Sequence, residues 1–217
     1  MLPLYYEYHN PVKILSGEAA LENIPYELHA LEAHAPLLLS DQGLKQVGAV
    51  DTVLHAIAPT VPKAIFTDIP ADSSVAVVNQ IAAYYKEQGC DSILAVGGGS
   101  VIDTAKGVRM VISQNTDDIE SLMGCEVLTA GRHIPFLAVP TTAGTGSEAT
   151  IAAVVTGEEH RKYAVSDLCL IPRYAVLDPT LTLSLPPAVT AQTGMDALSH
   201  AVEAYLSLYY NTRETRA

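Results

Sequence analysis

The amino-acid sequence predicts an α/β fold with a parallel β-sheet that is covered by helices. Short apolar runs alternate with amphipathic stretches of helical period as far as Pro140. These runs contain almost no polar residues, which is typical of strands that are buried on both faces. Alternation of such strands with helices favours right-handed crossovers, which would place helices on both sides of the sheet.

The first two strand–helix pairs precede Gly89. Residues 36–40 form a candidate for a buried strand, and apolar side chains spaced three and four apart over 42–57 predict one helix after it. Residues 64–66 form the second strand. An apolar stripe over 75–85 predicts the next helix, which Gly89 would end.

The third strand, at residues 93–96, leads into a run of three glycines at 97–99. Glycines let the backbone approach a ligand closely. Ser100 and Asp103 have the spacing of a capping box, so we expect a helix to begin at Ser100. The N-terminus of a helix is a binding site for pyrophosphate. The alternative is a tight strand-to-helix turn with no ligand.

The fourth strand, at residues 136–139, leads into a loop at 140–148 that is rich in hydroxyl groups and glycine. Such a loop can bind phosphate, ribose or a carboxamide, although an ordinary Ser/Thr-rich loop has the same composition. Thr145 and Glu148 have the spacing of a second capping box. Because a parallel sheet brings the carboxyl ends of its strands together, the two loops are expected to lie side by side.

The residues after this loop do not continue the regular alternation of apolar runs and helical stretches. Residues 151–156 and 174–177 are predicted as strands, and Pro186-Pro187 opens a long helical region. We therefore place a domain boundary near residues 180–187.

Four further polar residues are candidates for a site. Asp41 follows a strand, where it can accept from a ribose 2′-OH and repel a 2′-phosphate, or simply cap a helix. Asp196 and His200 are four apart on a predicted helix, so both can reach one divalent ion or form a hydrogen-bonded pair. A metal site needs three or four protein groups. Lys162 lies in a charged stretch that is compatible with a solvated turn.

Composition fits a packed core and excludes two classes of partner. Hydrophobic residues make up 49% of the 217 residues, and charged residues make up 17%. Twelve Lys and Arg residues against 24 Asp and Glu residues give a net charge of −12. Because nucleic acids and anionic membrane surfaces are themselves negative, neither is an expected partner.

The cysteines and the N-terminal segment bear on location. Cys90, Cys125 and Cys169 contain no CxxC pair and are odd in number, so we expect three reduced thiols in a cytoplasmic protein. Residues 1–11 lack the basic and apolar segments of a signal peptide. No apolar run approaches the ~20 residues that span a bilayer.

Taken together, these segments resemble the iron-containing (group III) alcohol dehydrogenase family. The strongest passages are residues 93–108, 134–150 and 178–205, and residues 10–24 and 37–44 are also similar. The resemblance implies a Rossmann-like N-terminal dinucleotide-binding domain, followed by the first helices of an all-helical metal-binding domain.

The resemblance also implies a division of the chain and an activity. Residues 1–182 would form the dinucleotide-binding domain, and residues 183–217 would begin the helical domain. The implied protein is a metal-dependent, NAD(P)-linked oxidoreductase that transfers hydride to or from a small alcohol or aldehyde. NAD is its expected cofactor, in preference to NADP, and the full-length protein is expected to be a homo-oligomer. A glycerol-dehydrogenase-like polyol oxidoreductase and an inactive nucleotide-binding fragment are the alternatives.

The same resemblance implies roles for individual residues. Asp196 and His200 would be the first two metal ligands, with Fe²⁺ as the family expectation and Zn²⁺ suited to the same donors. No residue is assigned to the chemical step. The implied cofactor contacts are Asp41 at the adenosine ribose, Gly98, Gly99, Ser100 and Asp103 at the pyrophosphate, Thr141, Thr142 and Thr145 on the other side of the cofactor, and Val154 and Lys162 near the ribose and nicotinamide.

Two departures from the family pattern stand out. Residues 70–73 read Pro-Ala-Asp-Ser where the family often has Pro-Asn-Pro-Thr, which changes any cofactor contact at Asp72. The family's two further His ligands come later in the helical domain, and no His follows His200. We therefore expect a truncated member that is inactive alone. The unpartnered apolar face of 187–208 predicts association or aggregation.

Overall fold

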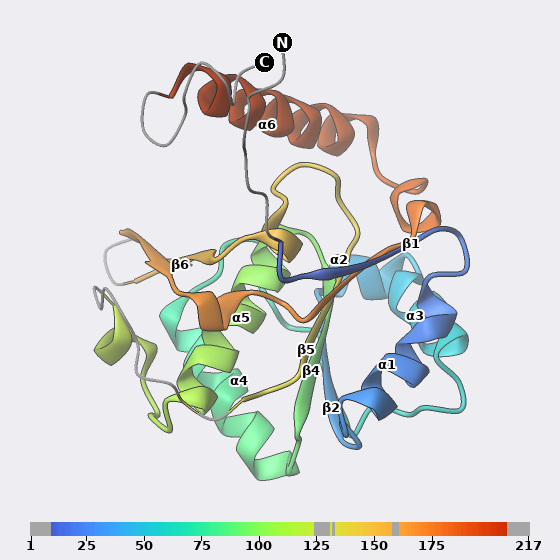
Figure 1. The fold of residues 1–217 in the computed structure, drawn as a ribbon, viewed down its shortest axis with the longest axis vertical. Coiled ribbons are helices and arrows are strands. Elements are labelled where there is room, and N and C mark those ends of the chain that lie inside the picture. Colours follow the sequence, from blue (N-terminus) through green and yellow to red (C-terminus); the bar gives the residue numbers. More distant parts are fainter. Residues whose placement is uncertain (1–9, 124–130, 132, 158–160, 208–217) are drawn as a thin grey trace, which may run out of the picture.

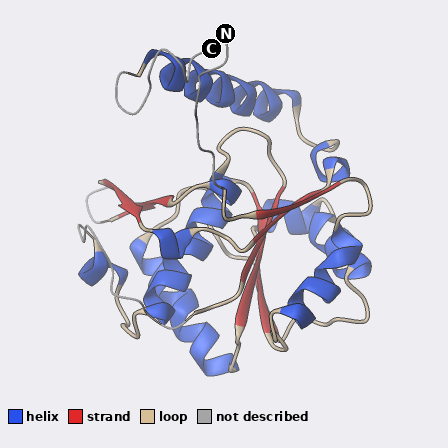
Figure 2. Cartoon of the chain, viewed as in Figure 1, coloured by secondary structure: helices blue, strands red, loops and turns tan. Residues whose placement is uncertain are grey.

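A six-stranded, wholly parallel sheet forms the centre of the computed structural model, which describes residues 10–123, 131, 133–157 and 161–207. The strand order is β1-β8-β5-β4-β2-β3, and helices lie on both sides of the sheet (Figures 1 and 2). The predicted parallel α/β fold is confirmed. The strands are β1 (Lys13–Ser16), β2 (Pro36–Leu39), β3 (Ala64–Phe66), β4 (Ser92–Gly97), β5 (Phe136–Pro140) and β8 (Tyr174–Leu177).

The described residues also form six α-helices, one hairpin and several short 3-10 helices. The hairpin pairs β6 (Ala152–Thr156) with β7 (Lys162–Ser166) in antiparallel fashion. A short 3-10 helix, η3 (Ser147–Ala149), precedes it. The α-helices are α1 (Ile24–Ala30), α2 (Gln42–Gln46), α3 (Ala49–Ala56), α4 (Val75–Gln88), α5 (Gly99–Ser113) and α6 (Pro187–Leu206).

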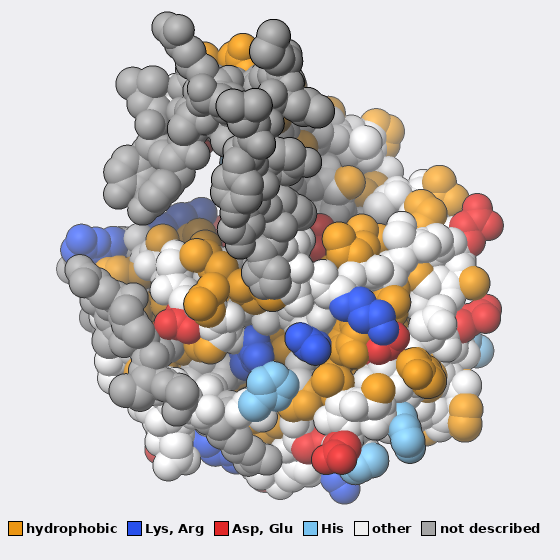
Figure 3. All heavy atoms as spheres, in the orientation of Figure 1, with side chains coloured by type: hydrophobic (Ala, Val, Ile, Leu, Met, Phe, Trp, Pro, Cys, Tyr) orange, Lys and Arg blue, Asp and Glu red, His pale blue; other side chains and the backbone are white. Residues whose placement is uncertain are grey.

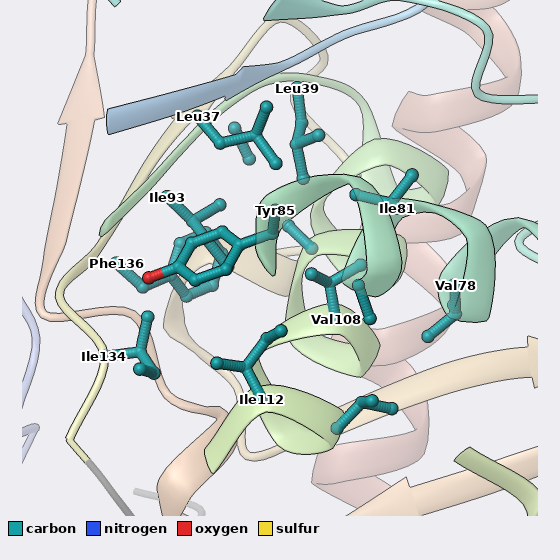
Figure 4. Close-up of a cluster of buried hydrophobic side chains, with 14 of the residues drawn as sticks. Leu37, Leu39, Val78, Ile81, Tyr85, Ile93, Val108, Ile112, Ile134 and Phe136 are labelled. Atoms are coloured by element: carbon teal, nitrogen blue, oxygen red, sulfur yellow. The ribbon is translucent and has the colours of Figure 1, made fainter. Parts of the chain in front are cut away.

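Successive residues of β2 point to opposite faces of the sheet and fill two separate cores. Leu37 and Leu39 pack in the cluster that contains α4 and α5, whereas Leu38 packs in the cluster that contains α1 and α3. Figure 4 shows Leu37 and Leu39 in the same cluster as Ile81 and Tyr85 of α4. Burial on both faces removes apolar surface from water at every position, which explains why the strands are continuous apolar runs.

Two strands were absent from the predicted set. Strand β1 contains Lys13 and is largely exposed at the edge of the sheet, so it lacks the apolar run of a central strand. Strand β7 begins at Lys162 and carries only one buried residue, Val165. Their partners decide their conformation, because β1 pairs with β8 and β7 pairs with β6.

The single helix predicted over residues 42–57 is wrong. The structure has two helices, α2 and α3, separated by Gly48 with a φ of 79°. A positive φ is incompatible with a continuous right-handed helix and is adopted readily by glycine. The apolar period continues across the break, which is why the pattern alone did not reveal it.

Helix α6 lies beyond the carboxyl end of the sheet, next to the loop that follows β5 (Figure 1). A Cβ atom at Gly144 of that loop would lie 2.7 Å from the carbonyl oxygen of Thr193, so the loop and the helix touch. No residue of α6 is buried. Its apolar residues Met195, Leu198 and Val202 are 64%, 54% and 46% exposed.

Two predictions about the chain as a whole can be compared with the described residues. None of their helices is both long enough and apolar enough to cross a membrane. Cys90 and Cys169 are free thiols, and Cys125 lies outside the described residues.

Candidate cofactor site

The candidate site lies at the carboxyl ends of β2, β4 and β5. The chain goes from β2 to β3 on one side and then returns to place β4 on the other side of β2. Helix α3 covers one face of the sheet here and α5 covers the other. In open α/β sheets such a reversal of strand order is where nucleotide ligands bind. Asp41 follows β2 and Gly98 follows β4 at this reversal.

The loops after β4 and β5 pack directly against each other, as predicted. A Cβ atom at Gly98 would lie 3.3 Å from Thr142 Oγ1, and one at Gly99 would lie 2.8 Å from Thr145 Cγ2. A side chain at Gly99 would therefore displace Thr145. The glycines are required for this close approach of the two loops, and the approach brings hydroxyl groups to the N-terminus of α5.

Helix α5 begins differently from the prediction. It starts at Gly99 with Gly98 as its N-cap residue, and no side chain caps it, so the predicted capping box at Ser100 is wrong. The Ser100 hydroxyl instead donates to the carbonyl oxygen of Ala71. The first N–H groups of a helix have no acceptor within the helix. Without a side-chain cap, those of α5 suit an anionic ligand.

Asp103 ties α5 to the segment that follows the β5 loop. Its carboxylate accepts from Ser147 Oγ at 2.5 Å and from the Val154 backbone N–H at 2.9 Å. The second predicted capping box is also wrong, because Gly146 is the N-cap residue of η3. Thr145 Oγ1 accepts from the Ser147 N–H at 3.2 Å, within a local turn.

A cavity of about 160 Å³ opens between these segments. Sites for whole small ligands occupy roughly 300–1,000 Å³, so this cavity fits one part of a dinucleotide. Its lining contains six predicted cofactor residues, namely Gly99, Ser100, Asp103, Thr145, Val154 and Lys162. It also contains Asp72, which the sequence marked only as a departure from the family pattern, together with Ser73 and Thr156, which were not predicted as site residues. The polar residues that follow β3 were the available signal for the first two.

An ion pair joins two sides of this cavity. Lys162 Nζ lies 3.3 Å from Asp72 Oδ1, with side chains that are 63% and 73% exposed. Exposed pairs contribute about 0–1 kcal/mol because solvent screens them. The pair can therefore rearrange when a ligand enters.

The four remaining predicted residues do not line this cavity. Gly98 and Thr142 form the contact between the two loops. Thr141 is buried, and its N–H donates to the Gly97 carbonyl at 3.1 Å. Asp41 caps α2, since its Oδ1 accepts from the Leu44 N–H at 2.9 Å. This cap uses one of the two carboxylate oxygens.

Asp196 and His200 face each other on α6. The distance from His200 Nε2 to Asp196 Oδ1 is 3.8 Å, and the side chains are 56% and 40% exposed. A carboxylate oxygen and an imidazole nitrogen suit Fe²⁺ or Zn²⁺. No group of three or more His, Cys, Asp or Glu residues that could hold a metal occurs among the described residues. The two side chains thus fit part of a metal site.

A larger cavity, of about 780 Å³, lies at the amino ends of β1, β5 and β8, lined in part by Arg109, His133, Cys169 and Arg173. Figure 3 shows several Lys or Arg side chains next to a His side chain on one face of the molecule. Burial and the charges of Arg109 and Arg173 lower the pKa of His133. Burial raises the pKa of Cys169 to about 12, which keeps its thiol protonated. The cavity contains no predicted cofactor residue and lies opposite the usual ligand side of the sheet.

Known proteins resemble this chain along most of its length. The family model for iron-containing alcohol dehydrogenases matches residues 11–179. The 4-hydroxybutyrate dehydrogenase of Cupriavidus necator is 36% identical over 194 residues, which cover 88% of this chain and 50% of that protein. The lactaldehyde reductase of Escherichia coli (strain K12) is 35% identical over 195 residues, again 88% of this chain and 50% of that protein.

Solved structures share the fold. The sulfoacetaldehyde reductase from Bifidobacterium kashiwanohense in complex with NAD⁺ has a TM-score of 0.87 and 30% identity, covering 97% of this chain and 56% of that chain. The chain spans about half the length of the curated relatives it matches. From the family match and the parallel α/β fold with its paired loops, the chain belongs to the iron-containing alcohol dehydrogenase family.

Proposed function

We propose that this chain binds NAD at the carboxyl ends of β2, β4 and β5, as the cofactor-binding part of an alcohol dehydrogenase or aldehyde reductase. The observation that carries the proposal is the contact between the β4 and β5 loops at the uncapped N-terminus of α5. The NAD⁺ complex of the similar sulfoacetaldehyde reductase supports the same cofactor.

Different residues of the chain bind different parts of the cofactor. The pyrophosphate lies at Gly98, Gly99 and Ser100, where helix amides and the dipole of α5 attract it. The hydroxyl groups of Thr141, Thr142 and Thr145 hold the cofactor from the β5 side. Asp103 acts by holding the wall of the cavity, and Val154 and Lys162 lie toward the ribose and nicotinamide.

Asp41 sets the preference between the two nicotinamide cofactors. Its carboxylate follows β2, and the cap of α2 occupies one oxygen. The other oxygen accepts from the ribose 2′-OH of NAD, whereas the 2′-phosphate of NADP is repelled. We therefore propose NAD over NADP.

Asp196 and His200 supply two ligands of a divalent metal, Fe²⁺ by family and Zn²⁺ by the same donor chemistry. When bound, such an ion acts as a Lewis acid on the oxygen of a small alcohol or aldehyde. The contact between Gly144 and Thr193 supports this proposal, because it brings the helix that carries Asp196 and His200 against the loop after β5. Hydride transfer needs the substrate and the nicotinamide to be held close together.

We propose the same division of the chain as the sequence suggested. Residues 1–182 form the dinucleotide-binding domain, and residues 183–217 begin a helical metal-binding domain. The lack of any buried residue in α6 supports this division, because a helix within the first domain would bury one face. The whole protein is proposed to be cytoplasmic and homo-oligomeric.

A second candidate function is nucleotide binding without turnover. Among the described residues only two metal donors come together, fewer than the three or four of catalytic sites. On this ground the 217-residue chain alone is expected to bind NAD and not to oxidise alcohols.

Calorimetric titration with NAD and with NADP tests the proposal. We expect the wild-type chain to bind NAD more tightly than NADP. Gly99→Val should abolish binding, because its side chain would collide with Thr145. Gly194→Ala is the control, since an added Cβ there would meet no other part of the protein beyond its own stretch of helix. Absence of NAD binding by the wild-type chain would overturn the proposal.

A turnover assay separates the two candidate functions. The chain is mixed with NAD, a small alcohol and Fe²⁺ or Zn²⁺, and the absorbance of NADH is followed. Binding without NADH formation supports the nucleotide-binding function for this chain. NADH formation would show that its residues complete a working metal site.

A further inference from the structure

Lys106 is a charged side chain that is fully enclosed in the protein. Its exposed fraction is 0%, and it is among the largest fully buried side chains of the described residues. It projects from α5, and its ammonium group donates to Thr150 O at 3.0 Å, Thr150 Oγ1 at 3.0 Å and Ala152 O at 2.6 Å. No carboxylate among the described residues forms an ion pair with it.

Burying a lysine has a high energetic cost, which an apolar side chain of the same length would avoid. The three acceptors around Lys106 match the three N–H donors of an ammonium group. The acceptors belong to Thr150, which follows η3, and to Ala152, the first residue of β6. Lys106 therefore serves as a three-point attachment of that segment to α5.

This attachment lies next to the one made by Asp103. The two residues are three apart on α5, so they share a face of the helix. Asp103 holds Ser147 and Val154, while Lys106 holds Thr150 and Ala152. Together they fix the segment 147–154 at four positions along its length.

The segment forms a wall of the candidate cofactor site. Val154 lines the cavity of about 160 Å³, and Thr156 of the same strand lines it two residues later. Thr145 comes just before the segment and contacts the position of Gly99. Movement of this segment away from α5 would open the cavity and separate the two loops.

We propose that Lys106 is a positioning residue for the cofactor site, which acts through its bonds to Thr150 and Ala152 to hold the β6 wall against α5. This inference rests on the proposed function, since the site it shapes is the proposed NAD site. Lys106 itself does not touch the cofactor.

The charge state of Lys106 gives the attachment a pH dependence. Burial lowers the pKa of Lys106 to about 8, while the carboxylate charges of Asp103 on α5 and Glu148 on η3 act in the opposite direction. The deprotonated amine has two N–H donors for three acceptors. The attachment is therefore complete below the pKa and weakens as the pH rises through it.

The test compares Lys106→Met with Lys86→Met. The control removes an exposed lysine on α4 that bonds to Thr116 and Asp117, away from the cofactor loops. NAD affinity is measured by calorimetry at about pH 7 and about pH 9, on either side of the pKa. Hydrogen-exchange protection of the Val154 amide, which donates to Asp103, is measured in the absence of NAD.

For the wild-type chain and for Lys86→Met we expect about a tenfold loss of NAD affinity between the two pH values, as for removal of a charged hydrogen bond. Lys106→Met should show the weaker affinity at both pH values and a lower protection factor at Val154. Equal affinity at both pH values in the wild type, with unchanged protection at Val154, would overturn the inference.

The outcomes separate this inference from the proposed function. If the wild-type chain binds no NAD at either pH, the proposed function fails, and the Val154 protection factors still decide whether Lys106 holds the segment. If Lys106→Met does not fold, the wild-type pH series in affinity and protection decides the question.

Discussion

Asp103 joins three parts of the cofactor site with a single carboxylate. One oxygen accepts from the Ser147 hydroxyl and the other from the Val154 amide. Its neighbour one helical turn later, Lys106, binds the intervening backbone. Polar side chains on one face of α5 thereby organise the β6 side of the cavity, while the apolar face of α5 packs on the sheet.

We predict that Asp103→Asn weakens both the fold and the cofactor site. An amide is neutral and has one oxygen acceptor in place of two, so the charged hydrogen bonds to Ser147 and Val154 are both lost. The free energy of unfolding should fall by about 1–3 kcal/mol, measured by urea denaturation, and NAD binding should weaken with it. Asp117→Asn is the control, because the Asp117 side chain is 96% exposed. Equal stability of the two variants would contradict the prediction.

At the scale of elements, backbone conformation sets the boundaries of these helices more than the hydrophobic pattern does. The break between α2 and α3 falls at Gly48, and α5 begins at Gly99, after Gly98 as N-cap residue and without a side-chain cap. The break at Gly48 does not interrupt the apolar period that predicted a single helix, and the start of α5 does not follow the predicted capping box. The existence of these helices followed from the sequence, but the boundaries depended on dihedral angles that only the folded chain imposes.

Substitutions at Gly48 test this account of the helix break. Gly48→Val should lower the free energy of unfolding by about 1–2 kcal/mol, because a β-branched residue is strained at a φ of 79°. Gly48→Asn should have a smaller effect, since asparagine tolerates the left-handed region. Urea denaturation of both variants provides the measurement. If valine were tolerated as well as asparagine, the backbone at this position would have to differ from the one described.

At the scale of the whole molecule, the chain combines a well-packed sheet with one uncovered helix. The sheet and its flanking helices bury two apolar clusters, whereas α6 contacts the rest through the Gly144 loop and buries no residue. Met195, Leu198, Val202 and Leu206 remain exposed on it. Exposed apolar patches of this kind lead to association.

We therefore predict that the 217-residue chain associates with increasing concentration through α6. Analytical ultracentrifugation should show a rise in mean mass, which Leu198→Glu with Val202→Glu reduces by adding charge to the apolar face. Gln192→Glu adds a negative charge at an exposed polar position of α6, outside the apolar face, and should leave association unchanged. A monodisperse monomer across the concentration series would contradict the prediction.

The sequence by itself determined the fold class, the four central strands and the two loops of the candidate site. These features follow from local information, because apolar runs and clusters of glycine or hydroxyl residues can be recognised in the sequence. Pairing with β8 and β6 decided that the edge segment β1 and the hairpin segment β7 form strands. The sequences of Lys13–Ser16 and Lys162–Ser166 are too polar to predict these strands.

Only the tertiary structure decided the tasks of the polar side chains within the site. The spacing of Ser100 and Asp103 suggested a helix cap, yet Asp103 binds Ser147 and Val154, 44 and 51 residues away. The same holds for Lys106, whose partners are 44 and 46 residues away. A side chain takes whichever hydrogen-bond partner the fold places nearest, and for buried polar groups that partner comes from packing rather than from spacing along the chain.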